Sequence, residues 1–200
     1  GGTNEAFNEI WWFYCSASSS DIDRYVIYNY SENIWYYGNM ARSAWLDSGL
    51  RDFPLAATYN NVLVDHERGI DDNETGTAAA ISSFISSADF DLDDGDKFVF
   101  VRRMVPDVSF EGSTDSSPAV TLTLSPSSFP GSGLNSPLSE SGESAGTVTR
   151  TATSPVEVYT TQIHTRLRGR QMALKIESSA TGVQWQLGIP RVDMRPDGRR

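Results

Sequence analysis

Three aspartates at alternate positions form the spacing in this chain that comes closest to a metal site. Asp89, Asp91 and Asp93 precede Gly95, and Ca²⁺ prefers carboxylate oxygens as ligands. In an EF-hand loop the glycine is sixth and a bidentate glutamate twelfth, whereas here the glycine is seventh and Phe100 is twelfth. The alternation of aspartate with apolar residues fits an edge strand with a solvated acidic face better. The three aspartates are therefore only a weak candidate site for a calcium ion.

The other residue types that commonly perform chemistry show no catalytic spacing. His66 and His164 stand far apart, which predicts hydrogen-bonded surface or interface histidines and no metal site. There is no Gly-x-Ser-x-Gly elbow, and no two carboxylates are singled out for glycoside cleavage. Cys15 cannot form an internal disulfide, and its place at the end of an aromatic strand predicts a small buried residue. No catalytic residue and no cofactor are predicted.

The charge of the chain is acidic overall but unevenly distributed. The net charge is −10, and of the sixteen cations only Lys97 and Lys175 are lysines. The acidic residues concentrate before position 100 and the basic ones after it. Arginine suits interfaces because its planar guanidinium forms bidentate contacts. An acidic chain does not hold DNA by neutralising phosphates, but it could line a passage through which DNA slides.

Arginines recur near the end of the sequence. Arg166, Arg168 and Arg170 alternate along a predicted strand, and Arg195 and Arg199 follow in the tail. Arginines aligned on one strand face attract carboxylates of a neighbouring subunit, so Arg166, Arg168 and Arg170 are predicted subunit-interface residues. Arg195 and Arg199 are subunit-interface candidates as well. A solvated strand face is the alternative. A nucleic-acid role is disfavoured because the chain is acidic and its arginines are not interleaved with exposed aromatics.

The first part of the chain, residues 1–76, is predicted to form short antiparallel strands. An aromatic strand at 7–15 precedes a hairpin at 24–38 and a second hairpin at 55–66. Aromatics at alternate positions are more often core than ligand platforms, although a sugar-stacking row is the alternative. The spacing predicts β-propeller-type blades or hairpins, an incomplete set with the rest expected upstream. The predicted packing residues here are Trp11, Tyr28 and Trp35.

The second part, residues 77–200, is predicted to be a β-sandwich-like antiparallel sheet domain. Strands are expected within 80–124, at 156–167 and at 170–177, and a last hairpin at 183–187. The core is expected from Met172, Leu174 and Ile176 on one face and Trp185 on another, as a sandwich requires. Residues 125–155 hold nine serines, four glycines and four prolines, which predicts a long exposed loop. The arginine-rich end from 191 is expected to be an extended tail. The fold class is therefore all-β.

Three stretches, taken in order, match the pattern of a known family. They are residues 8–14 with the hairpin at 24–38, then 66–69 with 86–96, and finally 166–172 with 182–188 and the closing 195–200. Together they resemble the C-terminal portion of the tail tube or nozzle structural protein of short-tailed (podovirus-type) bacteriophages. The resemblance covers nearly the whole chain except the serine-rich loop. Gln186 departs from it, because that motif more often carries an arginine there.

The resemblance implies a structural protein of the virion, located in the phage tail, and not an enzyme. Such proteins form a homo-oligomeric ring of six subunits below the portal and adaptor and extend the DNA-ejection channel. Their partners are other tail proteins (adaptor, fibres or spikes), and DNA passes without sequence-specific binding. The family's fold combines a β-propeller with β-sandwich-like elements and brings no catalytic residue. The start Gly-Gly-Thr-Asn, which has no methionine, and the close at 196–200 lead us to expect the missing part upstream.

Two other classes of function stay open from the sequence. A carbohydrate- or receptor-binding β-module would need an exposed aromatic row with polar flanks. A glycan hydrolase fragment would need a concave pocket with two facing carboxylates.

Overall fold

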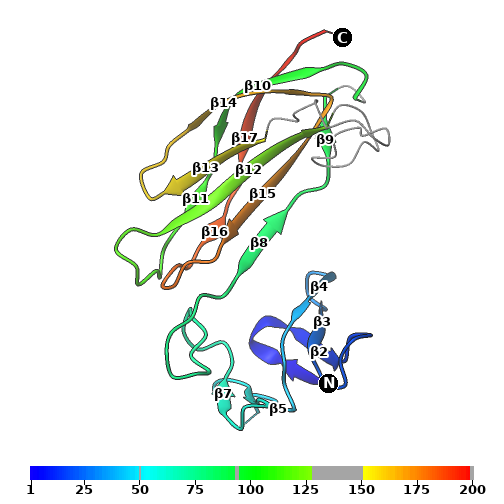
Figure 1. Cartoon of the computed structure of the whole chain (residues 1–200), viewed down its shortest axis with the longest axis vertical. Helices are drawn as coiled ribbons and strands as arrows, with labels where there is room; N and C mark the ends of the chain where they lie inside the picture. The colour runs from blue at the N-terminus through cyan, green and yellow to red at the C-terminus, as the bar shows by residue number, and fades with distance from the viewer. Residues whose placement is uncertain (50, 93–94, 128–150, 199–200) are drawn as a thin grey trace. The chain divides into compact units, whose positions relative to one another are not determined.

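The computed structural model in Figure 1 describes residues 1–49, 51–92, 95–127 and 151–198. The fold is all-β, with 49% of the described residues in strands that form several antiparallel sheets. No α-helix occurs in the described ranges. Across the same ranges, no helix long and apolar enough to cross a membrane is found.

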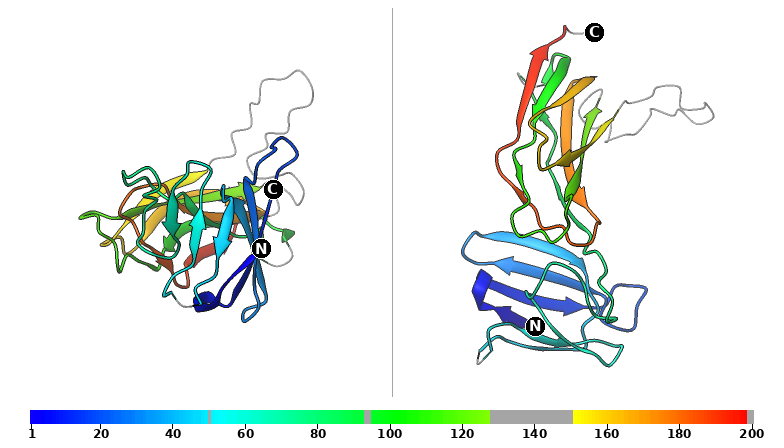
Figure 2. Two further views of the ribbon diagram at one scale, coloured as in Figure 1. Left: turned by 90° about the horizontal axis from the view of Figure 1, so that it is seen from below. Right: turned by 90° about the vertical axis from the view of Figure 1, so that its left-hand side faces the viewer.

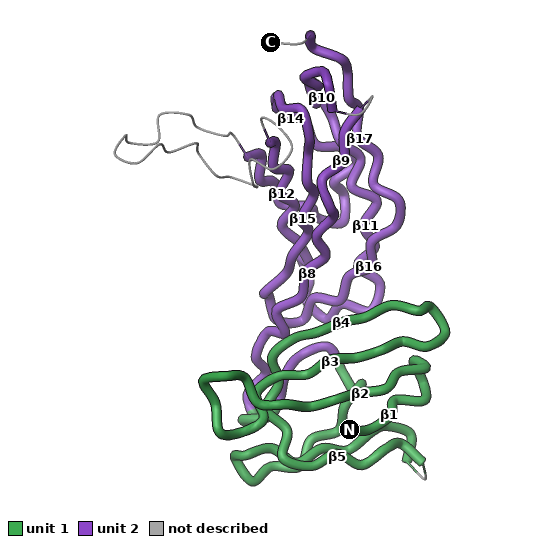
Figure 3. Tube along the Cα trace, turned by 90° about the vertical axis from the view of Figure 1, so that its right-hand side faces the viewer, with its two compact units in different colours: residues 1–69, 74–76 green, residues 70–73, 77–200 purple. Residues whose placement is uncertain are grey.

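The chain divides into two compact units, coloured separately in Figure 3. Unit 1 consists of Gly1–Gly69 and Glu74–Gly76, and unit 2 of Ile70–Asn73 and Thr77–Arg200.

Unit 1 contains two small antiparallel sheets. The first has its four strands in sequence order, β1-β2-β3-β4, and a short 3-10 turn, η1 (Glu5–Phe7), joins β1 to β2. The second has the order β5-β6-β7. The strands are β1 (Gly2–Asn4), β2 (Glu9–Tyr14), β3 (Arg24–Asn29), β4 (Ile34–Asn39), β5 (Ala44–Leu46), β6 (Leu55–Ala57) and β7 (Leu63–Asp65).

Asparagines form the tight connections of unit 1. Asn8, Asn33 and Asn61 all have positive φ (58°, 56° and 61°), a region that asparagine tolerates better than most residues. Asn33 closes the β3–β4 hairpin and Asn61 lies between β6 and β7. The two hairpins predicted at 24–38 and 55–66 are confirmed.

One face of the β1-β2-β3-β4 sheet, here called the inner face, packs by aromatic stacking. Trp11 is only 5% exposed, and its ring centroid lies 5.3 Å from Tyr25 and 5.2 Å from Trp45 of β5. The His66 ring lies 4.7 Å from Trp45 on the same face. Trp11 is thus a core residue, as predicted.

Two other predicted packing residues lie on the opposite, outer face of that sheet. Tyr28 is half-buried, and Trp35 is 61% exposed, so its assignment to the core was wrong. The reason is strand parity, because Trp35 pairs with Tyr28, whereas Trp11 pairs with the inward-facing Ile27. The prediction for Cys15 was also wrong, since its side chain is exposed just after β2.

The described residues of unit 2 form ten further strands in three antiparallel sheets. Their orders are β13-β12-β15-β8, with β9 also paired to β15, then β14-β10-β17, and β11-β16. The strands are β8 (Ser83–Ser86), β9 (Phe90–Asp91), β10 (Val99–Val105), β11 (Val108–Ser109), β12 (Ala119–Ser127), β13 (Ala152–Glu157), β14 (Ile163–Gly169), β15 (Gln171–Ser178), β16 (Gln186–Leu187) and β17 (Arg191–Pro196).

The two larger sheets of unit 2 face each other across one apolar core, as the layers in Figure 2 show. Met104 of β10, Leu122 of β12 and Ile176 of β15 are almost completely buried in it. The predicted core residues Met172 and Leu174 are also buried. Trp185 is half-buried against this core, and its Nε1 donates a hydrogen bond to Ser83 Oγ at 3.0 Å.

Four element predictions for the second half need correction. The single strand expected at 156–167 is two strands, because β13 ends at Glu157 and a turn precedes β14. The loop expected at 125–155 is shorter, because Ser125–Ser127 are buried in β12 and β13 begins at Ala152; positions 128–150 lie outside the described residues. In the expected hairpin at 183–187, β16 pairs with β11 and not with β15. The expected extended tail is strand β17, paired with β10.

Truncation of a core side chain in unit 2 tests this packing. Met172→Ala should lower the free energy of unfolding by about 2–5 kcal/mol, because a fully buried side chain leaves a cavity. Ile189→Ala, at a position 71% exposed, should change it by less than about 0.5 kcal/mol. Urea denaturation measures both. Equal effects at the two positions would contradict the assigned core.

Candidate interface on an arginine-bearing sheet

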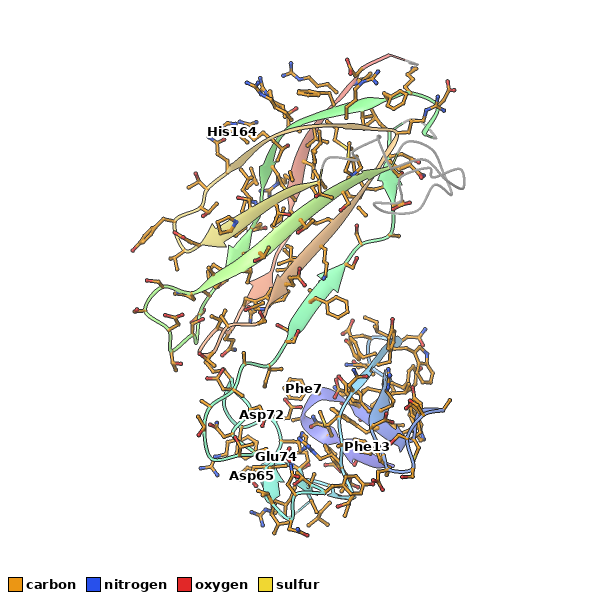
Figure 4. The ribbon with its side chains drawn as sticks, viewed as in Figure 1. Phe7, Phe13, Asp65, Asp72, Glu74 and His164 are labelled. Carbon is orange, nitrogen blue, oxygen red and sulfur yellow. The ribbon has the colours of Figure 1, made fainter. Side chains whose placement is uncertain are left out.

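Strand β14 divides its side chains cleanly between core and solvent. Ile163, Thr165 and Leu167 are buried, whereas the intervening His164, Arg166 and Arg168 are exposed. This period-2 alternation gives the β14-β10-β17 sheet one face in the core and one face outside. In Figure 4, nitrogen-tipped side chains gather near β10 and β14, where His164 is labelled.

The register of the sheet brings arginines from three strands together on its outer side. Phe100 of β10 is paired with Arg168 of β14 on one side and with Arg195 of β17 on the other. A β-bulge between Val101 and Arg103 interrupts the alternation. The sheet with its flanking turn thus carries the arginine face, defined by Arg102, Arg103, Arg166, Arg168, Arg170, Arg191 and Arg195.

The carboxylate of Asp193 forms ion pairs with three of these arginines. Asp193 Oδ2 lies 3.2 Å from Arg102 Nη2 and 3.9 Å from Arg103 Nη2, and Asp193 Oδ1 lies 3.8 Å from Arg195 Nε. The three arginine side chains are 43–61% exposed. Pairs this exposed contribute about 0–1 kcal/mol each. They leave most of the arginine donors directed to solvent or to a partner.

Arg168 is held within its own chain. Its Nε forms an ion pair with Asp197 Oδ2 at 2.5 Å, and its Nη2 donates a hydrogen bond to the Asp197 carbonyl at 3.1 Å. The guanidinium carbon also lies 4.1 Å from the ring centroid of Phe98, and that of Arg170 lies 5.1 Å from it. These cation–π contacts fix both guanidiniums against the sheet.

The arginine face is cationic on a chain of net charge −10. Within the part of the chain that the structure describes, Asp193 forms ion pairs with Arg102, Arg103 and Arg195, and Asp197 forms one with Arg168. Such a surface attracts carboxylate or phosphate groups, and its interactions weaken as salt rises.

Most of the predicted interface arginines lie together on this face. Arg166 and Arg168 lie on β14 and Arg195 on β17, the two strands that flank β10, and Arg170 stands at the turn between β14 and β15. Arg199 lies outside the described residues. Proximity does not test the interface role, which stays a prediction.

Sequence reasoning missed three members of the face and one of its features. The missed arginines are Arg102, Arg103 and Arg191. Arg191 is separated from Arg195 by an even number of positions, which places both on the same face of a strand, so this spacing could have revealed it. The missed feature is a pair of half-buried phenylalanines among the arginines, neither of which is an exposed aromatic. Phe98 lies beneath two guanidiniums, and Phe100 stands between two arginine-bearing strands.

The outer side of the β1-β2-β3-β4 sheet forms a second exposed surface, here called the aromatic face. Trp12, Trp35 and Tyr37 are 42%, 61% and 82% exposed. The Trp35 ring centroid lies 6.0 Å from Trp12 and 4.6 Å from Tyr28, in stacked arrangements. Tyr28 Oη donates a hydrogen bond to Asn33 Oδ1 at 2.9 Å, which provides a polar flank.

The alternate aspartates do not converge in the part that the structure describes. Asp91 lies in β9, where its Oδ2 accepts a hydrogen bond from Gln171 Nε2 at 3.0 Å. Asp89 precedes that strand, and Asp93 lies outside the described residues. No group of three or more His, Cys, Asp or Glu side chains placed to hold a metal occurs among the described residues.

The two histidines occupy different environments. His66 packs in the aromatic core of unit 1 and accepts a hydrogen bond from Arg42 Nε at 3.0 Å. Arg42 in turn pairs with Glu74 at 3.2 Å, and both side chains are largely buried. His164 is exposed on β14, beside the arginine face.

No protein-family model matches the chain, and a comparison with curated proteins finds no match either.

Neutralising the shared carboxylate tests whether the arginine face stabilises the fold. Asp193→Asn should change the free energy of unfolding by less than about 1 kcal/mol, because its partners are exposed. Glu157→Gln, at an exposed position of β13, is the matched control. Thermal unfolding at low and high salt measures both variants. A loss above about 2 kcal/mol would indicate a desolvated network instead.

Proposed function

We propose that this chain is part of a structural protein of a phage tail, located in the virion. It forms part of a hexameric nozzle or tube ring that extends the DNA-ejection channel below the portal and adaptor. The ordered resemblance across residues 8–38, 66–96 and 166–200 is the observation that carries this proposal. The protein acts by assembly and catalyses no reaction.

The arginine face supports the ring because its charge is opposite to that of the rest of the chain. In a ring each subunit presents one surface to a different surface of the next, so the two surfaces must be complementary. Arg166 and Arg195 of one subunit then meet carboxylates of the neighbouring copy. Arg168 and Arg170, held over Phe98, present guanidiniums whose orientation is already fixed.

The two sheets of unit 1 support the propeller assignment. Propeller blades are four-stranded antiparallel sheets, which is the order β1-β2-β3-β4. We assign this sheet to one blade and β5-β6-β7 to the next, in contact through Trp11 and Trp45. A closed propeller needs about four to eight such blades. The further blades are therefore part of the proposal.

The acidic balance of the chain supports a conduit for DNA. A channel wall of the same sign as the phosphates repels them, so DNA slides without being held. The adaptor and the fibres or spikes of the tail are the expected protein partners.

Charge reversal on the arginine face tests the assembly. The purified protein should appear as six-fold rings in electron micrographs and as a hexamer by light scattering. Arg166→Glu combined with Arg195→Glu should give monomers, because acidic surfaces then face each other. Arg24→Glu, at an exposed position of unit 1, should leave the rings intact. A protein that is monomeric at every concentration and absent from virions would overturn the proposal.

The aromatic face favours a second candidate function, a carbohydrate- or receptor-binding β-module. Trp12, Trp35 and Tyr37 expose large ring surfaces beside a polar flank, as sugar stacking requires.

Glycan-array binding by the isolated monomer separates this candidate from the ring. Under the second function, Trp35→Ala should abolish binding, because Trp35 stacks between Trp12 and Tyr28. Tyr159→Ala, which removes a 92% exposed aromatic from unit 2, is the control. Absence of binding to any glycan would remove the second candidate.

A further inference from the structure

Unit 1 contains an oxygen-rich cluster at one end of the inner face. Asn4 of β1 is paired directly with Glu9 of β2, so their side chains leave the sheet on the same side. Glu67, which follows β7 by two residues, reaches this pair, and Asn4 Nδ2 donates a hydrogen bond to Glu67 Oε1 at 3.2 Å. The cluster therefore combines one amide and two carboxylates from three separate segments.

The amide oxygen of this cluster has no partner. Asn4 is 0% exposed, and its Oδ1 is buried without a hydrogen bond within the described residues. A buried acceptor left unsatisfied costs about 1–3 kcal/mol. Since Asn4 Nδ2 is bonded to Glu67, the amide lies within the cluster, and its free oxygen is an available ligand.

The two carboxylates have no ion-pair partner in the part of the chain that the structure describes. Neither Glu9 nor Glu67 forms an ion pair with a described residue. Burial raises the pKa of both carboxyl groups, and the charge of Glu9 raises the pKa of Glu67 further. Trp11 Nε1 donates to Glu9 Oε2 at 3.1 Å and orients that carboxylate.

The backbone directs Glu67 toward the cluster at a conformational cost. Its φ is 59°, in the left-handed backbone region that residues other than glycine and asparagine rarely adopt. Glu67 as a whole residue is exposed, although its carboxyl group is partly buried. The cluster thus has an open side through which an ion and its water ligands can enter.

We propose that Asn4 Oδ1 and the carboxylates of Glu9 and Glu67 bind a divalent cation, with Ca²⁺ as the preferred ion. Calcium takes six to eight oxygen ligands in flexible geometry, including amide oxygens, carboxylates and waters. Magnesium requires near-ideal octahedral geometry, which an irregular set from three segments does not provide. The site is separate from the alternate aspartates of unit 2 and does not depend on the proposed role in a phage tail.

Calcium should bind the EDTA-treated chain at pH 7 with a stoichiometry of one in isothermal titration calorimetry with CaCl₂. The melting temperature of unit 1 should rise by about 5 °C or more when calcium exceeds its dissociation constant about 100-fold. MgCl₂ at the same concentration should give a smaller shift. Failure of the unaltered chain to bind calcium would overturn the proposal without any variant.

Conservative variants locate the site. Glu67→Gln keeps the shape but removes one charge, and it should weaken calcium binding at least about ten-fold. Two control variants, Glu32→Gln at an exposed position of unit 1 and Asp91→Asn in unit 2, should bind as the unaltered chain does. Loss of binding in Asp91→Asn with full binding in Glu67→Gln would overturn the assignment. The assignment would also be overturned if the protein became more stable at low pH and did not respond to calcium. The carboxylates of Glu9 and Glu67 would then share a proton and not bind an ion.

Discussion

The pairing of β10 with β14 and β17 is the constraint on which most of unit 2 depends. One strand places Val99, Val101 and Met104 in the core and its arginines outside, so the same register sets the packing and the charge of the surface. Hydrophobic burial provides the free energy that holds this register. The ion pairs around Asp193 are exposed and add little to it. The cationic surface is therefore a consequence of the core, and its arginines are available for contacts outside the chain.

Unit 1 follows the same logic with aromatic rings in place of aliphatic side chains. Trp11 and Trp45 hold the two sheets together, while the opposite side of the first sheet leaves Trp35 exposed. The rings that stabilise the inner face also enclose polar atoms at its end, where Asn4 is completely buried. The β1-β2-β3-β4 sheet therefore carries an inner face packed in the core, an exposed aromatic face and a cluster of polar atoms at the end of the inner face.

Much of the fold was predictable because strand alternation is a local property. The all-β class, both hairpins of unit 1 and the buried row of Met172, Leu174 and Ile176 follow from period-2 patterns. Which face of a strand meets the core is not local, and for that reason Trp35 was assigned to the wrong side. Pairing between strands that are distant in the sequence cannot be predicted from local patterns either. The residues of β17 were therefore predicted to be an extended tail. The cluster of Asn4, Glu9 and Glu67 joins residues more than fifty positions apart, and no spacing reveals it.

The bulge in β10 shifts the inward and outward alternation of its side chains by one residue. Up to Val101 the odd-numbered residues point inward, but after the bulge it is Met104 that is buried, and Arg102 and Arg103 both escape the core. Strict alternation would have placed Arg103 inside and Met104 outside. Loss of one of the two residues between Val101 and Met104 would remove the bulge and leave Met104 facing the core by plain alternation. The extra residue therefore adds a second arginine to the outer face without moving Met104 out of the core.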